Sequence, residues 1–86
     1  METITINAVR YALYSVEDLS SFFLHHPSHP LTSFTDPSTF VDFAIQSLQR
    51  SYVLILLTPH SYPVDPVDAR VKPILENIFL SLASTS

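Results

Sequence analysis

Histidines are the residues of this sequence whose type and spacing come nearest to a metal site. His25, His26 and His29 fall within five positions, and His60 is the fourth and last histidine. Imidazole nitrogens are good zinc ligands, and His60 or an aspartate would complete a tetrahedral shell around the three. Against this, HHxxH on a loop is not a recognised metal spacing. We therefore predict solvent-facing histidines and no bound metal or cofactor, with a metal- or pH-responsive regulator as the alternative function.

The same four histidines predict a response to pH. An unperturbed histidine titrates near pH 6.5. The chain has a net charge of −4 with its histidines neutral, so protonating all four would cancel that charge. A protein near zero net charge associates more readily. We expect self-association to increase as the pH falls from about 7 to about 5.5.

Catalytic motifs are missing from the sequence. Serine, histidine and aspartate are all present, but no motif places a nucleophile beside a base. The chain contains no glycine, which phosphate-binding loops and nucleophile elbows require, and no cysteine, which excludes thiolate chemistry and disulfides. The carboxylate pairs Glu17 with Asp18 and Asp65 with Asp68 lie where helices are expected to begin, which is a structural role. We predict a protein that is not an enzyme.

Charge and hydropathy exclude two further classes of partner. Arginine and lysine together number four and are scattered, so the ten aromatic residues are expected in a core or interface and not in a nucleic-acid groove. The longest apolar run, residues 52–57, is six residues long, far short of the ~20 that cross a bilayer. No secretory signal or transit peptide is recognisable. We expect a soluble, cytoplasmic protein without a nucleic-acid partner or a transmembrane segment.

The missing residue types also suggest an origin. Glycine, cysteine and tryptophan are absent and share G at the middle codon position, whereas serine, leucine, proline, threonine and histidine are plentiful. A biased genome, or a reading frame overprinted on another gene as in some viral accessory proteins, would produce this pattern. Chance, together with a helical fold that tolerates the loss of glycine, is the alternative.

The most regular segment lies near the C-terminal end. Asp65 followed by Pro66 is typical of a helix N-cap with proline in the first helical position. Apolar residues then recur at three- and four-residue steps up to residue 83, as on one side of an amphipathic helix. Pro73 falls inside this pattern, where it either kinks the helix or marks a second start after an irregular turn. We predict a helix over about 66–83 that bends near residue 73.

Two earlier segments also show helical spacing. Asp36 and Pro37 repeat the cap and first-position pattern, and the apolar residues that follow are Val41, Ala44, Ile45, Leu48 and Tyr52. Residues 51–58 are apolar all round and fit either the buried end of this helix or a separate strand. Residues 5–25 also carry apolar side chains at helical steps, with a capping box at Ser15 and Asp18 that indicates a break. Residues 3–6 alternate and fit a short strand.

These segments predict one domain over residues 1–86, with proline-, serine- and histidine-bearing loops at 25–35 and 59–64. We expect an all-α fold, a small three- to four-helix bundle that forms oligomers. The alternative is an α+β domain with a short two-stranded sheet, in which residues 51–58 pair with residues 3–6 or 7–14.

An excess of apolar side chains points to a function. If residues 37–57 form a helix, five apolar residues point away from its main apolar side: Phe40, Phe43, Val53, Leu54 and Leu57. A chain of 86 residues has too little body to cover every side of such a helix, and exposed apolar surface favours association. We therefore predict a small non-catalytic interaction protein that presents these residues to a second copy, as a homodimer, or to another protein.

Overall fold

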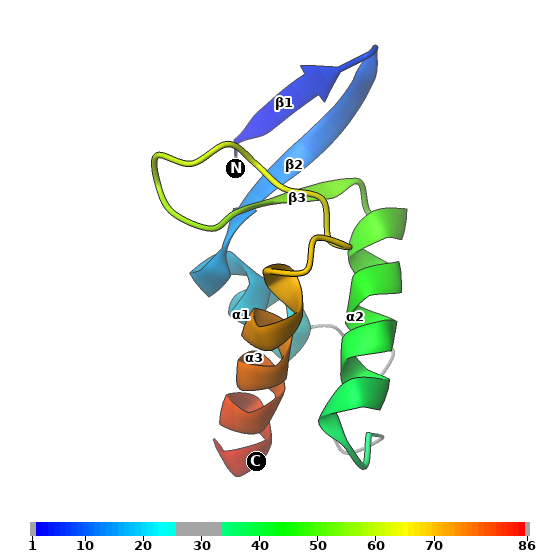
Figure 1. Ribbon diagram of the computed structural model, residues 1–86, viewed down its shortest axis with the longest axis vertical. Coiled ribbons are helices and arrows are strands. Elements are labelled where there is room, and N and C mark those ends of the chain that lie inside the picture. Colours follow the sequence, from blue (N-terminus) through cyan, green and yellow to red (C-terminus); the bar gives the residue numbers. More distant parts are fainter. Residues whose placement is uncertain (1, 26–33, 86) are drawn as a thin grey trace.

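The computed structural model describes residues 2–25 and 34–85, and it shows an α+β fold in place of the expected helical bundle (Figure 1). In those residues three helices cover one side of a mixed sheet with strand order β1-β2-β3. The elements in chain order are β1 (Thr3–Ile6), β2 (Val9–Ser15), α1 (Val16–Leu24), α2 (Pro37–Arg50), β3 (Val53–Leu56) and α3 (Val71–Thr85). The α+β alternative was therefore closer, although the sheet has three strands and not two.

Strands β1 and β2 form an antiparallel hairpin, so the predicted helix over residues 5–25 is wrong in its first half. Ile6 pairs with Val9 across a two-residue turn. Both turn residues have positive φ, 51° at Asn7 and 66° at Ala8, as a type I′ hairpin turn requires. Glycine normally takes such a position, and in this glycine-free chain an alanine occupies it. The missing glycine therefore concealed the turn from a reading of the sequence.

Helix α1 begins where the capping box predicts. The Ser15 hydroxyl accepts a hydrogen bond from the Asp18 amide, and the Asp18 carboxylate accepts one from the Ser15 amide, each at 3.2 Å. The break predicted near Ser15 is thereby confirmed, because the chain leaves strand β2 and enters helix α1 at this residue.

Helix α2 begins as predicted and ends before the ambiguous segment. Asp36 caps it by accepting a hydrogen bond of 2.9 Å from the Thr39 amide, and Pro37 is its first residue. At the other end Tyr52 adopts a left-handed conformation with φ of 54°, which stops the helix. The chain then continues as β3, whose Leu54 pairs in parallel with Leu13 of β2. The helical interpretation of residues 51–58 is therefore wrong.

Helix α3 begins at Val71, five residues later than predicted. Asp65 accepts a hydrogen bond of 2.9 Å from the Val67 amide, which closes a turn and does not cap a helix. Pro73 then falls in the first turn of α3, where an N–H has no partner within the helix. The predicted helix over 66–83 with a bend at residue 73 is therefore wrong. The alternative interpretation is correct, in which a helix begins near Pro73 after an irregular turn.

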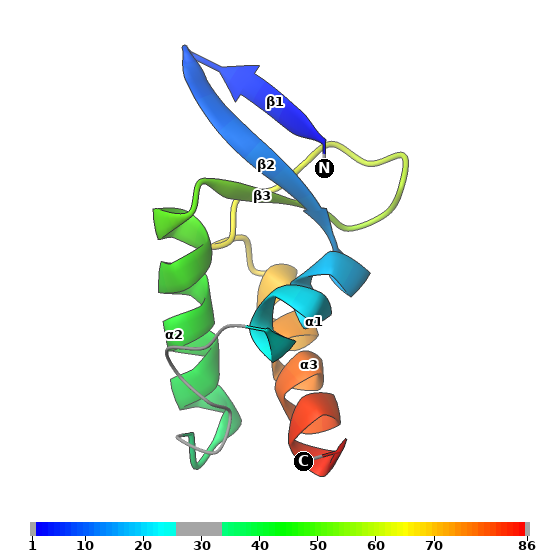
Figure 2. The same cartoon turned by 180° about the vertical axis from the view of Figure 1, so that it is seen from behind.

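The three helices lie together at one end of the molecule, next to the sheet (Figures 1 and 2). The core lies between the helices and the side of the sheet that carries Val53 and Ile55. All three helices and β3 contribute to it. The buried cluster contains Leu19, Phe23, Phe40, Val41, Ala44, Leu48, Val53, Ile55, Val71, Leu75, Ile78 and Phe79. No helix in the part of the chain that the structure describes is long and apolar enough to cross a membrane.

Candidate functional site

Three of the five expected interface residues lie in the interior of the chain. Phe40, Val53 and Leu54 are 1%, 3% and 9% exposed. The first two belong to the core cluster, and Val53 reaches it because residues 53–56 form a strand and not a helix. These three side chains are therefore not available to a partner in the folded chain.

The other two expected interface residues are half-buried. The Phe43 ring lies 5.2 Å from the Phe34 ring, and Leu57 packs against the core. The residues that α2 exposes are polar or charged: Ser38, Thr39, Asp42, Gln46, Gln49 and Arg50. The apolar helical surface expected at these positions is therefore not present on α2.

The structure describes two of the four candidate metal ligands. His25 follows α1 and His60 lies between β3 and α3, and both are exposed. His26 and His29 lie outside the described residues. Within residues 2–25 and 34–85 no three histidine, aspartate or glutamate side chains come close enough to hold a metal ion. The metal-responsive function stays a prediction for a zinc titration to test.

A continuous apolar surface occurs on the hairpin and not on α2, where it was expected. Successive side chains of a strand point to opposite sides of a sheet, and residues paired across strands point to the same side. Val53 and Ile55 face the core, so Leu54 and its partner Leu13 face away from it. The β1–β2 register places four further apolar residues on this side. We call the resulting set the outer hairpin face: Ile4, Ile6, Val9, Tyr11 and Leu13.

The tip of the outer hairpin face is open to solvent. Ile6 is 42% exposed and Val9 36%, while the other three residues are half-buried. Figures 1 and 2 show that the end of the hairpin projects beyond the helices, so no helix reaches it from either side. Tyr52, which is exposed, extends the apolar surface, since its ring lies 6.1 Å from the Tyr11 ring.

The hairpin also has a free edge. The sheet order places β1 at one end, with β2 on its inner side and no described strand on its outer side. The opposite edge is different, because Val64 forms an antiparallel bridge with Ile55 of β3, with both hydrogen bonds at 2.9 Å. Strand β1 therefore keeps peptide groups that no described strand pairs, whereas part of the β3 edge is already occupied.

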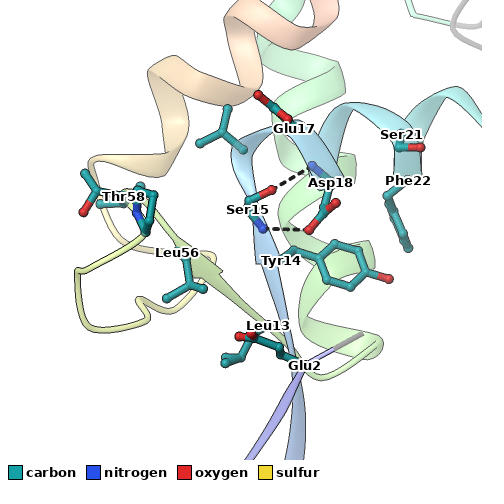
Figure 3. A pocket seen from close by; sticks show the side chains of 13 residues that line it. Glu2, Leu13, Tyr14, Ser15, Glu17, Asp18, Ser21, Phe22, Leu56 and Thr58 are labelled. Carbon is teal, nitrogen blue, oxygen red and sulfur yellow. Dashed lines mark hydrogen bonds between the residues drawn. The ribbon is translucent and has the colours of Figure 1, made fainter.

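An open groove of about 880 Å³ lies where β2 and β3 end and α1 begins (Figure 3). Carboxyl ends of parallel strands are a common place for ligands in α/β sheets. Its walls combine apolar residues with three carboxylates, those of Glu2, Glu17 and Asp18. None of these carboxylates forms a salt bridge with another described residue. The groove is therefore a concave surface with negative charge.

The groove offers no activated nucleophile among its lining residues. Figure 3 shows that the Ser15 hydroxyl and the Asp18 carboxylate are both engaged in the capping box of α1. Neither His25 nor His60, the two histidines that the structure describes, lines the groove, so neither can act as an imidazole base for its hydroxyl groups. The Tyr14 and Phe22 rings pack edge to face at 5.8 Å on one side of it. This arrangement can hold a ligand but shows no machinery for acyl transfer.

The groups with shifted pKa values serve the helices and not the groove. The Thr39 amide and the hydroxyls of Thr39 and Ser38 donate to Asp36, which lowers the pKa of that carboxyl. Arg70 donates to Asp68 through its side chain and amide, which lowers the pKa of Asp68 to about 2. Both carboxylates lie just before helices, where hydrogen-bonded negative charge is stabilising.

The outer hairpin face is the functional candidate that sequence reasoning missed, although residues 3–6 do alternate visibly. The alternation continues through Val9, Tyr11 and Leu13, but the same residues also fit helical spacing. The chain matches no protein-family model, no curated protein and no solved structure.

Proposed function

We propose that this chain is a non-catalytic interaction protein that associates with a second copy of itself through the β1–β2 hairpin. One observation carries the proposal: the hairpin places its apolar side chains on the side of the sheet that no helix covers. Antiparallel sheets that face water usually carry polar side chains on that side. An apolar outer side is instead typical of a surface that another protein covers.

The free energy of burial supports a contact at this place. Each square ångström of apolar surface that leaves water contributes about 25 cal/mol. Ile6 and Val9 keep much of their surface in water in the single chain, and Tyr52 is exposed beside Tyr11. The surface is small by the standards of stable complexes, which bury roughly 800 Å² on each partner. We therefore expect a weak dimer that forms with increasing concentration.

Charge also favours the hairpin over the rest of the surface. The chain carries a net charge of −4, so two copies repel each other on average. Within residues 2–15 the charged side chains are Glu2 and Arg10, which cancel. A contact at the hairpin brings fewer negative charges together than a contact at the acidic groove, because the two surfaces share Glu2 but not Glu17 and Asp18.

Light scattering coupled to size exclusion tests the proposal over a range of concentrations. The decisive variant carries Ile6→Asp and Val9→Asp, which place two charges on the outer hairpin face. The matched control carries Leu24→Asp and Leu80→Asp, two substitutions of equal charge on exposed leucines of α1 and α3. We expect the wild type and the control to become dimeric at high concentration and the hairpin variant to stay monomeric.

Two results of this experiment would contradict the proposal. Loss of the dimer in the Leu24 and Leu80 variant alone would move the contact from the hairpin to α1 and α3. A wild type that stays monomeric at all concentrations would end the self-association proposal. Circular dichroism of each variant shows whether it keeps the wild-type secondary structure.

A further inference from the structure

We propose that two copies pair through the free edge of β1, antiparallel, with the two Ile4 residues facing each other on a two-fold axis. This inference rests on the proposed self-association and specifies its geometry. The second copy occupies the outer edge of β1, so that the two three-stranded sheets become one continuous sheet. The pairing uses peptide groups that no described strand satisfies.

The register of the hairpin determines which peptide groups of β1 point outward. The Leu13 amide donates to the Glu2 carbonyl at 3.0 Å, so this pair is hydrogen-bonded. In an antiparallel ladder hydrogen-bonded pairs alternate with pairs that are not bonded. Ile4 with Tyr11 is therefore the next bonded pair, and Ile4 points its peptide groups inward. The N–H and C=O groups of Thr3 and Thr5 point outward.

A second observation supports this assignment from the other side of β2. The Ala12 amide donates to the Tyr52 carbonyl at 2.9 Å, so it points toward β3. Ala12 is the register partner of Thr3, and a residue that bonds toward β3 does not bond toward β1. Thr3 thus turns its peptide groups to the free edge.

Only one antiparallel register pairs the outward peptide groups of both Thr3 and Thr5 with those of the second copy. Thr3 of one copy must lie opposite Thr5 of the other, and each of these pairs exchanges both of its N–H···O bonds. This register places Ile4 opposite Ile4 of the second copy, on the two-fold axis, as an isologous contact requires. It is self-complementary, so the strand needs no different partner sequence.

Side chains and charges agree with this register. Glu2 lies opposite Ile6 of the second copy, so no two like charges face each other across the new edge. The outer hairpin faces of the two copies lie on the same side of the joined sheet, where Ile4 gains an apolar neighbour on its open flank. Val9 and Tyr52 lie outside this contact, because β1 separates β2 from the paired edge. Strand β1 reads TITI, with a β-branched residue at every position.

The protective devices of edge strands are absent from β1. Monomeric proteins block such edges with lysine, proline, a bulge or an inward-pointing charge. Residues 3–6 contain no charged residue and no proline, and their register with β2 is continuous without a bulge. Strand β1, at the edge of the sheet that the structure describes, is therefore open to pairing with a strand of another molecule.

Cysteine cross-linking of the full chain tests the register, because the sequence has no cysteine of its own. In a pair that is not hydrogen-bonded the Cα atoms are about 4.5 Å apart, within disulfide range. We expect Ile4→Cys to form a disulfide-linked dimer on mild oxidation. Ile6→Cys is the matched control, because in this register its two copies are four residues out of step, roughly 14 Å apart.

A proline substitution tests the hydrogen bonds independently. Thr5→Pro removes an N–H that the hairpin itself does not use, and edge strands tolerate proline at such a position. We expect this variant to keep the wild-type circular dichroism spectrum and to lose at least tenfold in dimer affinity. Thr5→Val keeps the N–H and the β-branched shape, so it should dimerise as the wild type does.

The outcomes separate this inference from the proposed function. If the wild type dimerises but Ile4→Cys does not cross-link, or Ile6→Cys cross-links equally well, the β1 pairing is wrong while self-association stands. A dimer that Thr5→Pro leaves unchanged would also overturn the pairing. A wild type that never dimerises would overturn both the self-association and the β1 pairing. If the β1 edge instead binds a strand of a different protein, purified Ile4→Cys will not cross-link.

Discussion

The hairpin and the three helices place their apolar side chains in opposite situations. Along the helices apolar residues recur every three or four positions, and this spacing leads them into one core. Along the hairpin they recur at every second position, and this spacing leads them to the outer hairpin face. The apolar residues expected on the surface of a helix are therefore mostly buried, whereas Ile6 and Val9 on the sheet stay partly exposed.

The difference between the two regions follows from length and position. Strand β3 is covered by the helices, but the hairpin extends past them, so its tip has no helix to pack against (Figures 1 and 2). Core residues such as Leu75 lose all contact with water, whereas Ile6 keeps 42% of its surface exposed. The helices should therefore govern the stability of the single chain, and the hairpin the association that we propose.

The largest expected effect compares one core residue with one hairpin residue. Leu75→Ala leaves a cavity in the core and should lower the free energy of unfolding by about 2–5 kcal/mol. Ile6→Ala removes a partly exposed side chain and should cost less than about 1 kcal/mol in dilute, monomeric protein. Urea denaturation followed by circular dichroism measures both. Similar losses for the two variants would show that the hairpin side chain is as well packed as the core.

An intermediate effect is expected at the hairpin turn. Ala8 holds φ of 66°, a conformation that costs an alanine roughly 1 kcal/mol or more and glycine almost nothing. Ala8→Gly should therefore raise the free energy of unfolding by roughly 0.5–1 kcal/mol, because the relieved strain exceeds the added freedom of the unfolded chain.

The same denaturation experiment includes a control for the glycine substitution. Ala69→Gly changes an exposed alanine that has no positive φ, so it should not stabilise the chain. If Ala8→Gly destabilises the protein instead, the turn is not left-handed at residue 8, and the register of the outer hairpin face would have to be revised.

The smallest expected effect is a difference in how the helices and the hairpin respond to acid. Asp36 and Asp68 both have pKa values below the usual 3.8, and that of Asp68 is about 2. A lowered folded-state pKa contributes stability that is complete above the unfolded value and is lost as the pH falls through the folded value. We expect the starts of α2 and α3 to loosen between about pH 4 and pH 2.

Backbone amide shifts recorded through that range would check this. The hairpin has neither of these carboxylates, so the amides of Thr39 and Val71 should respond before those of Thr5 and Tyr11. Asp36→Asn and Asp68→Asn should remove the respective response. A hairpin that loosens first would reverse the comparison between the two regions.

Local signals in the sequence were more reliable than periodicity. The caps at Asp36 and Ser15 predict the starts of α2 and α1 correctly, because each depends on hydrogen bonds between residues three positions apart. Asp65 with Pro66 has the same appearance but closes a turn, since Asp68 and Arg70 form a second turn before α3. A cap pattern alone does not show whether the following residues continue as a helix.

Periodicity failed where one segment fits two patterns. In residues 9–13 the apolar side chains alternate, yet with their neighbours they also fit helical steps, and the turn that decides between them lacks glycine. In residues 51–58 the deciding feature is the left-handed Tyr52, which no rule for tyrosine predicts. The outer hairpin face depends on the hairpin turn and on the pairing of β2 with β3, so it could not be predicted from the sequence.

The order of the elements along the chain affects how the protein is made. The hairpin needs only residues 3–15, whereas β3 joins β2 after α1 and α2 have been synthesised. Hairpins form in microseconds, and a ribosome adds about 5–20 residues per second. A two-stranded hairpin is at best marginally stable in water by itself, so between its synthesis and the arrival of β3 it forms and opens repeatedly.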